Sequence, residues 1–135
     1  MRWLRRSGVV VAAIATIVLG VGTQAHAAVP PANVGWLYTK SGSGAVFFDA
    51  DLAGYPSYEK ITVCDNRSDG RGIHAVLAGD YGGQGVVVKD PSNNGSCVSV
   101  QGNFFSDGYG VHVQVCEYWG SPTKYANCYH GWGVA

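Results

Sequence analysis

Short runs of β-branched and aromatic residues, separated by clusters of Gly, Asn, Asp and Ser, follow one another from residue 45 to the end of the chain. The runs are too short for helices, and no helical periodicity connects them. Short strands with turn residues at this spacing are typical of an all-β sandwich. We therefore predict a small antiparallel sandwich of about seven strands in Greek-key, immunoglobulin-like order. The predicted strands are residues 45–49, 60–65, 73–79, 85–89, 97–101, 110–117 and 128–134.

Alternation within these runs assigns side chains to the two faces of each sheet. Val111, Val113 and Val115 share one face of their strand, and Ile61 and Val63 share one face of theirs. These apolar faces should point into the core. By the same alternation, Cys64, Cys97 and Cys116 fall on the polar faces, so they should not bridge the two sheets through the core.

The N-terminus has the order of a cleavable export signal. Arg2, Arg5 and Arg6 precede an apolar run over residues 8–22, and Ala25-His26-Ala27 fits a signal-peptidase site. A membrane anchor is the alternative, but the run is short and diluted by Ala, Gly and Thr. We expect residues 1–27 to be removed and the protein to be secreted to the extracellular space.

The remaining 108 residues are enough for one domain. They hold six basic and nine acidic side chains, a mildly acidic balance that argues against nucleic-acid binding. No basic amphipathic stretch indicates a membrane surface.

All four cysteines lie in this exported part, which is the pattern of a disulfide framework. A zinc site is the alternative, but the paired spacings it needs are missing. If the strands follow a Greek-key order, Cys64 would pair with Cys97 and Cys116 with Cys128, each between neighbouring strands at one end of the sandwich. Two other pairings remain open, because sequence alone does not determine connectivity.

The predicted bridges would hold together three loops, residues 65–72, 90–96 and 117–127, which we call the stapled end. Exposed aromatic and arginine side chains dominate binding hot spots. The alternative is that some of these aromatic side chains fold back over the core. The candidate partner-binding residues at the stapled end are Arg67, Arg71, Tyr118, Trp119 and Tyr125, with Lys124 beside them.

These loops and the strands also carry residue types used in metal binding and in catalysis. Oxygen ligands for calcium are present in Asp65, Asn66, Asp69, Asp90, Asn93, Asn94 and Glu117, but Asp and Asn also form purely local turns, and we expect no metal or other cofactor. The candidate bases are His74, His112 and His130, without a nucleophile motif near them, so we expect no enzyme. His74 and His112 should lie on solvated faces and would be neighbours if their strands pair.

Residues 28–44 are rich in Pro, Gly, Ser and Asn and predict an extended N-terminal arm. Its aromatic anchor, Trp36-Leu37-Tyr38, is a further candidate for partner binding, because an extended segment can add to a partner's sheet or fill its groove. The alternative is that this segment pairs with its own domain as an edge strand.

Five segments of the chain, GSGAVFFDADL, TVCDNRSDGRG, DPSNNGSC, DGYGVHVQVCE and NCYHGW, resemble a group of small secreted actinobacterial proteins. Within that group the chain is similar to the adaptor subunit of the umbrella toxin particles of Streptomyces. The resemblance covers nearly all of the exported part. It implies a non-enzymatic connector between a lectin-like subunit and a large polymorphic toxin used in bacterial competition. It also implies that an N-terminal segment, here about Val29 to Tyr38, docks into the lectin-like partner.

We therefore expect a secreted protein-interaction module whose partners are other secreted proteins. One alternative is a carbohydrate-binding or cell-envelope-binding domain that uses Tyr118, Trp119 and Tyr125 as a stacking platform. Another is an inhibitor of an extracellular hydrolase with a rigid inserted loop.

Overall fold

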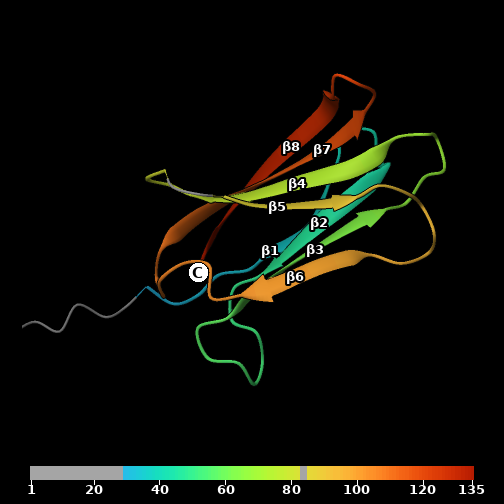
Figure 1. Cartoon of the computed structure of the whole chain (residues 1–135). Helices are drawn as coiled ribbons and strands as arrows, with labels where there is room; N and C mark the ends of the chain where they lie inside the picture. The colour runs from blue at the N-terminus through green and yellow to red at the C-terminus, as the bar shows by residue number, and fades with distance from the viewer. Residues whose placement is uncertain (1–28, 83–84) are drawn as a thin grey trace, which may run out of the picture.

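The computed structural model describes residues 29–82 and 85–135, so the predicted signal peptide lies outside the described residues. Two antiparallel four-stranded sheets pack face to face (Figure 1). The first sheet has the order β1-β2-β3-β6 and the second the order β5-β4-β7-β8. The strands are β1 (Val34–Tyr38), β2 (Gly44–Asp49), β3 (Glu59–Asp65), β4 (Gly72–Gly79), β5 (Val86–Asp90), β6 (Val98–Gly102), β7 (Gly110–Trp119) and β8 (Lys124–Val134).

The predicted all-β sandwich is confirmed. Hairpins join neighbours within each sheet, while the connections from β3 to β4, from β5 to β6 and from β6 to β7 cross between the sheets. Six predicted strands agree with β2 to β7 within two residues at each end. The last strand was predicted too short, because β8 begins at Lys124 and Tyr125 lies within it. Among the described residues no helix long and apolar enough to cross a membrane is found.

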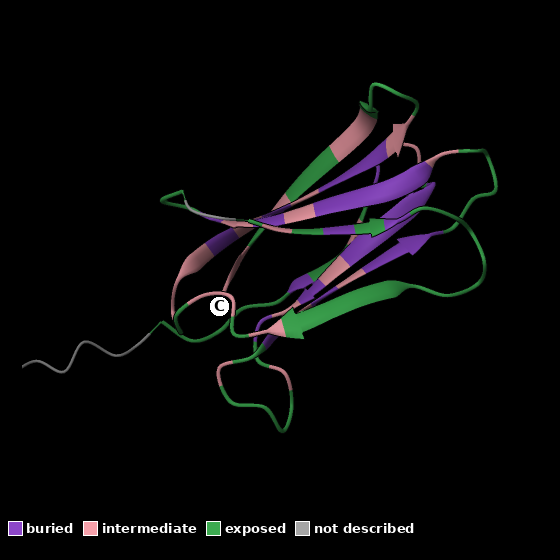
Figure 2. Ribbon diagram, viewed as in Figure 1, coloured by how far each residue is buried: buried purple, intermediate pink, exposed green. Residues whose placement is uncertain are grey.

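The core lies between the two sheets, where the inward face of each central strand is buried (Figure 2). The predicted inward residues Ile61, Val63, Val111, Val113 and Val115 are all fully buried. Alternation assigned them correctly because the side-chain period of a strand is two and each sheet buries one face.

Residues 34–38, which we expected in an extended arm, form strand β1 at the edge of the first sheet. β1 pairs with β2 through Val34–Phe48, Leu37–Val46 and Tyr38–Ala45, with an irregularity between the first two pairs. Val34 belongs to the core, and Leu37 packs against it. The edge-strand alternative is therefore the one that the structure shows for this segment.

The two long flanks of the sandwich differ. On one flank β1 lies against β8, with backbone hydrogen bonds between Ala32 and Val134. On the other flank the edge strands are β5 and β6, and every residue of β6 except Gly102 is exposed (Figure 2). Val98 and Val100 remain 38% and 39% exposed although they lie opposite the inward residues Val63 and Ile61.

Gly133 makes the β1–β8 flank possible. A Cβ atom at Gly133 would lie 2.6 Å from the carbonyl oxygen of Ala32 and 3.1 Å from Val34 Cγ2. A backbone oxygen cannot move aside cheaply, so Gly133→Ala is expected to destabilise the domain by about 1–3 kcal/mol. Urea denaturation measures this. Gly35→Ala is the control, because a Cβ there meets nothing within 4 Å; equal midpoints for the two variants would contradict the close approach.

Candidate functional site

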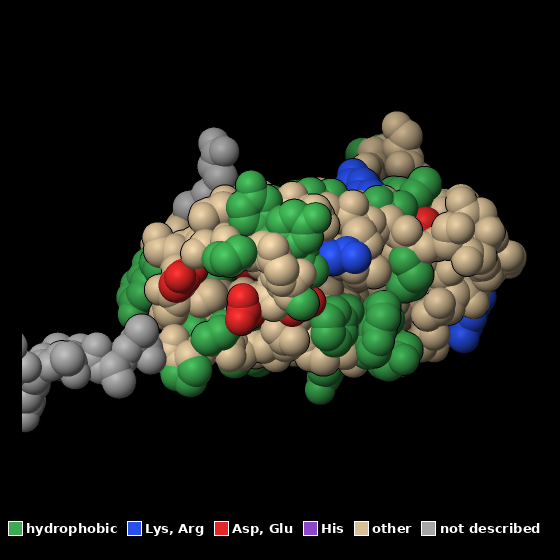
Figure 3. Space-filling view, turned by 90° about the horizontal axis from the view of Figure 1, so that it is seen from below, with side chains coloured by type: hydrophobic (Ala, Val, Ile, Leu, Met, Phe, Trp, Pro, Cys, Tyr) green, Lys and Arg blue, Asp and Glu red, His purple; other side chains and the backbone are tan. Residues whose placement is uncertain are grey.

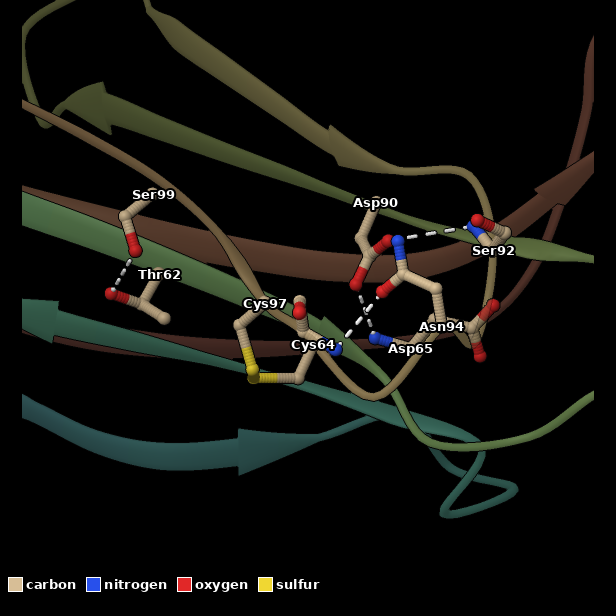
Figure 4. Close-up of a disulfide and its surroundings, with 9 residues drawn as sticks. Thr62, Cys64, Asp65, Asp90, Ser92, Asn94, Cys97 and Ser99 are labelled. Carbon is tan, nitrogen blue, oxygen red and sulfur yellow. Dashed lines mark hydrogen bonds between the residues drawn. A yellow bond between two sulfur atoms is a disulfide. The ribbon is translucent and has the colours of Figure 1, made fainter.

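The disulfides join Cys64 to Cys97 and Cys116 to Cys128, with Cα–Cα distances of 4.4 and 4.1 Å. Each bridge links neighbouring strands of one sheet on its outer face, as the alternation and the assumed topology predicted. Figure 4 shows the first bridge beside the outward hydroxyls of Thr62 and Ser99, which lie 3.0 Å apart on β3 and β6. Bridges of this kind fit an oxidising environment.

The second bridge spans an irregularity in the β7–β8 hairpin. Cys116 lies between the pairs Val115–Tyr129 and Glu117–Ala126, so two residues of β8, Asn127 and Cys128, stand opposite one of β7. Asn127 has a φ of 52°, a left-handed conformation that Asn tolerates better than most residues. Its carbonyl oxygen accepts a hydrogen bond from the backbone N–H of Lys40 at 2.9 Å.

The acidic and amide side chains of the loops shape local turns. In each case the side-chain oxygen accepts a hydrogen bond from a backbone N–H two residues later, as in an Asx turn. Asp65 and Asp69 do this in the β3–β4 loop, and Asp90 and Asn94 in the β5–β6 loop (Figure 4). Within the described residues no group of three or more His, Cys, Asp or Glu side chains is arranged to hold a metal ion.

Glu117 is the centre of a buried polar cluster under the stapled end. It is 1% exposed, and its carboxylate accepts hydrogen bonds from the hydroxyls of Ser41 and Ser43 and from Arg71 Nη1 at 2.5 Å. Burial by itself raises the pKa of Glu117, but the bonds from Ser41, Ser43, Arg71 and Asn127 outweigh burial and lower the pKa to about 2. Glu117 is therefore ionised at neutral pH and ties the β1–β2 turn to β7.

Arg71 connects this cluster to the surface. Its guanidinium carbon lies 4.3 Å from the centroid of the Trp119 ring while the same group pairs with Glu117. Trp119 is thus partly covered by Arg71 rather than fully open to solvent. A guanidinium held between a carboxylate and an indole has few remaining conformations.

Two further buried carboxylates, Asp65 and Asp90, lie beneath the β3–β4 and β5–β6 loops. The backbone N–H of Asp65 donates to Asp90 Oδ2 at 2.8 Å, which joins the two loops (Figure 4). Burial raises the pKa of Asp65, and the nearby charge of Asp90 raises it further, while the hydrogen bond from the Arg67 backbone opposes both. Arg67 itself is exposed, and its Nη2 donates to the Ser41 carbonyl oxygen at 3.4 Å.

The other aromatic residues of the stapled end lie in strands, not in a loop as we had predicted. Tyr118 on β7 is directly opposite Tyr125 on β8. Both rings contact His74 of β4, with centroid distances of 6.3 and 4.9 Å. Lys89 Nζ lies 5.2 Å from the centroid of the Tyr118 ring. These residues form one aromatic patch on the outer face of the second sheet, where Tyr125 is half exposed.

The predictions for the histidines need correction. His74 pairs with Cys116 and His112 with Ala78, so the two are not neighbours although their strands pair. His74 is buried rather than solvated, because Tyr118 and Tyr125 cover it, and its Nδ1 has no hydrogen-bond partner. Burial lowers the pKa of His74, and the charge of Lys89 lowers it further.

The side chains of the segment Trp36-Leu37-Tyr38 lie on both faces of the first sheet. Trp36 and Tyr38 are half exposed on the outer face of the first sheet, where Trp36 packs 5.4 Å from Phe47. The side chain of Leu37 packs against the core, so a partner could contact it only if β1 moved away from the domain. Figure 3, which views the molecule from below, shows hydrophobic side chains interspersed with acidic and basic side chains on the surface that it presents.

Sequence reasoning missed Ser41, Ser43 and Asn127 as parts of the candidate site. Ser41 lies 76 residues from Glu117 along the chain. The sequence Ser-Gly-Ser-Gly is typical of a turn and does not indicate that its hydroxyls bind a carboxylate. Only the adjacency of the β1–β2 turn and β7 brings them together.

The chain was compared with known proteins at the levels of family, curated sequence and solved structure. No family model, no curated protein and no solved structure matches it. The candidate site is therefore characterised by its own geometry: a hydrogen-bonded, disulfide-linked end with exposed arginine and tyrosine side chains, and a second aromatic face on β1.

Proposed function

We propose that this protein is a secreted, non-enzymatic protein-interaction module that acts as an adaptor between two other secreted proteins. The observation that supports the proposal is the Glu117 cluster, which ties two of the three loops of the stapled end to the β1–β2 turn before any partner arrives. Loops that are already ordered lose less entropy on binding. The resemblance to the umbrella-particle adaptor supports a lectin-like protein and a large toxin as the partners, in bacterial competition.

Two separate contact surfaces support a connecting role. One is the stapled end, with Arg67, the Arg71–Trp119 stack and Tyr125. The other is the outer face of β1, with Trp36 and Tyr38. The first surface combines aromatic and arginine side chains, the types that dominate hot spots.

The adaptor proposal is tested by capture of partners from culture supernatant with the tagged secreted protein, followed by mass spectrometry. Removing residues 28–38 would delete a core strand, because Val34 and Leu37 pack inside the domain. Exposed substitutions are the better probes. Trp36→Ala with Tyr38→Ala should lose one partner, and Arg67→Ala with Tyr125→Ala should lose the other, each by at least about tenfold, as for removal of hot-spot residues.

Unchanged thermal melting would show that both double variants remain folded. Capture of the same partners by both variants at wild-type levels would contradict the two-surface proposal. Loss of both partners from either variant would also contradict it, because the surfaces would then not act separately.

A glycan-binding role for the stapled end is the second candidate, and the structure changes its details. Trp119 is stacked under Arg71 and is a poor platform, whereas Tyr125 is half exposed on the outer face. Retention on cell-wall resin that is lost in Tyr125→Ala and kept in Trp119→Phe would favour that candidate over the adaptor.

A further inference from the structure

An open groove of about 580 Å³ runs around the edge of β8, from the bulge at Asn127 and Cys128 beside the stapled end to Trp132. Its volume is within the range of small-ligand sites. The groove is lined by Lys40 of the β1–β2 turn and by five residues of β8, namely Asn127, Cys128, Tyr129, His130 and Trp132.

The two aromatic rings of this groove, Trp132 and Tyr129, are exposed to solvent. Trp132 is 71% exposed and Tyr129 is 50% exposed. Neither ring packs against another aromatic ring of the described residues, whereas Trp36 rests on Phe47 and Trp119 lies under Arg71. Trp132 is therefore the most open indole of the three in residues 29–82 and 85–135.

The backbone that carries Trp132 is held on both sides. Gly131 and Gly133 flank it and face β1, where added Cβ atoms would lie 2.9 Å from Val34 and 2.6 Å from the Ala32 carbonyl oxygen. On the other side Trp132 pairs with His112 of β7. An exposed indole on a fixed backbone can bind a stacked ligand with little loss of conformational entropy, because its backbone is already ordered.

The polar side chains of the groove decide what stacks there. Lys40 is the one permanently charged group in the lining, and no carboxylate lines the groove with it. Its backbone is anchored by the 2.9 Å hydrogen bond to the Asn127 carbonyl oxygen. The groove thus combines a cation with two aromatic faces and the hydrogen-bonding side chain of His130.

These features fit a sugar polymer that carries negative charge. The C–H face of a pyranose ring packs on an indole or phenol ring, hydroxyl groups bond to His130, and a carboxylate or phosphate pairs with Lys40. A purely apolar ligand would desolvate Lys40 without pairing it. Nucleic acid is disfavoured, because the part of the chain after residue 27 holds nine acidic and six basic side chains.

We propose that the β8 groove binds an anionic saccharide through Trp132, Tyr129 and Lys40. None of these three residues belongs to the two contact surfaces of the adaptor proposal, so the two proposals are tested by different variants. The anion would be either a uronate carboxylate or a glycan phosphodiester, and the two sources are separated by the choice of probe.

The test is titration calorimetry of the secreted protein with three probes: a galacturonic acid oligomer, purified wall teichoic acid, and a neutral galactose oligomer of matched length. We expect binding to at least one of the two anionic probes and at least tenfold weaker binding of the neutral one. Binding should weaken as salt is raised from 0.05 to 0.5 M, because exposed charges are screened.

Trp132→Ala should reduce affinity for the bound anionic probe at least tenfold, and Lys40→Gln should reduce both the affinity and its dependence on salt. Tyr81→Ala is the control, since Tyr81 is an exposed aromatic residue in the β4–β5 connection. Failure of both anionic probes to bind would overturn the proposal. So would equal binding of the neutral probe, or affinity unchanged by Trp132→Ala or by Lys40→Gln.

Discussion

Reduction of both disulfides is expected to lower the melting temperature of the domain formed by residues 28–135 by at least about 20 °C. The bridges close sequence separations of 33 and 12 residues. In the chain-entropy model these contribute about 4 and about 3 kcal/mol. A domain of this size has a total stability of about 5–15 kcal/mol, so the reduced protein should be marginal. Circular dichroism melts with and without a phosphine reductant measure the effect.

Replacing the bridges one at a time separates their contributions. The pair Cys64→Ala and Cys97→Ala should cost about 1 kcal/mol more than the pair Cys116→Ala and Cys128→Ala, because the first bridge closes the longer loop. A melting temperature unaffected by reductant would contradict the proposed role of the bridges in stability.

Substitution of Glu117 by Gln is expected to destabilise the domain by about 3 kcal/mol. The change keeps the shape of the side chain but removes the charge that Arg71, Ser41 and Ser43 bind. An amide also presents its NH2 group to donors in place of one oxygen. Urea denaturation at pH 7 would measure the loss.

Glu59 offers a matched control at the opposite end of the sandwich. It is equally buried, but one of its oxygens, Oε1, has no hydrogen-bond partner while Oε2 accepts from the Phe104 N–H at 2.8 Å. Burial raises the pKa of Glu59, only partly opposed by that backbone bond. Glu59→Gln should therefore change stability by less than about 1 kcal/mol. A loss as large as that of Glu117→Gln would contradict the special role of the Glu117 cluster.

The pH dependence follows from the direction of the Glu117 shift. Its folded pKa, about 2, lies below the ordinary value of 4.5, so the unfolded state takes up a proton first as the pH falls. The stabilisation from Glu117 is fully present above about pH 4.5 and is lost between pH 4.5 and 2. Glu117→Gln should flatten the stability profile in this window, and an unchanged acid profile would contradict the assignment.

The spacing of short runs predicted the sandwich, and alternation within the runs predicted its core. The inward positions of Val111, Val113 and Val115 could be predicted because a strand exposes and buries side chains with a period of two. The outer-face position of the cysteines followed from the same period, and with an assumed strand order it gave the correct disulfide pairing.

The prediction from local sequence was wrong for residues 34–38, where turn-forming residues around the strand led to the expectation of an extended arm. Residues 34–38 follow a stretch with two adjacent prolines, yet they form β1 because Val34 and Leu37 complete the core against Gly131 and Gly133. Glycines at these positions of β8 carry no signal of a partner strand when read along the chain. Tyr118, Trp119 and Tyr125 were placed in a loop, although the hairpin turn is confined to residues 120–123.

The sequence by itself determined the class of fold, the face of each central strand and the end of the molecule where the bridges lie, because all three depend on short-range periodicity and chain order. Tertiary structure alone decided that Glu117 meets Ser41, Ser43 and Arg71, that Arg71 covers Trp119, and that Trp132 stays open beside Lys40. These contacts join segments far apart in the chain, and the energies that select them arise only when two sheets are packed together.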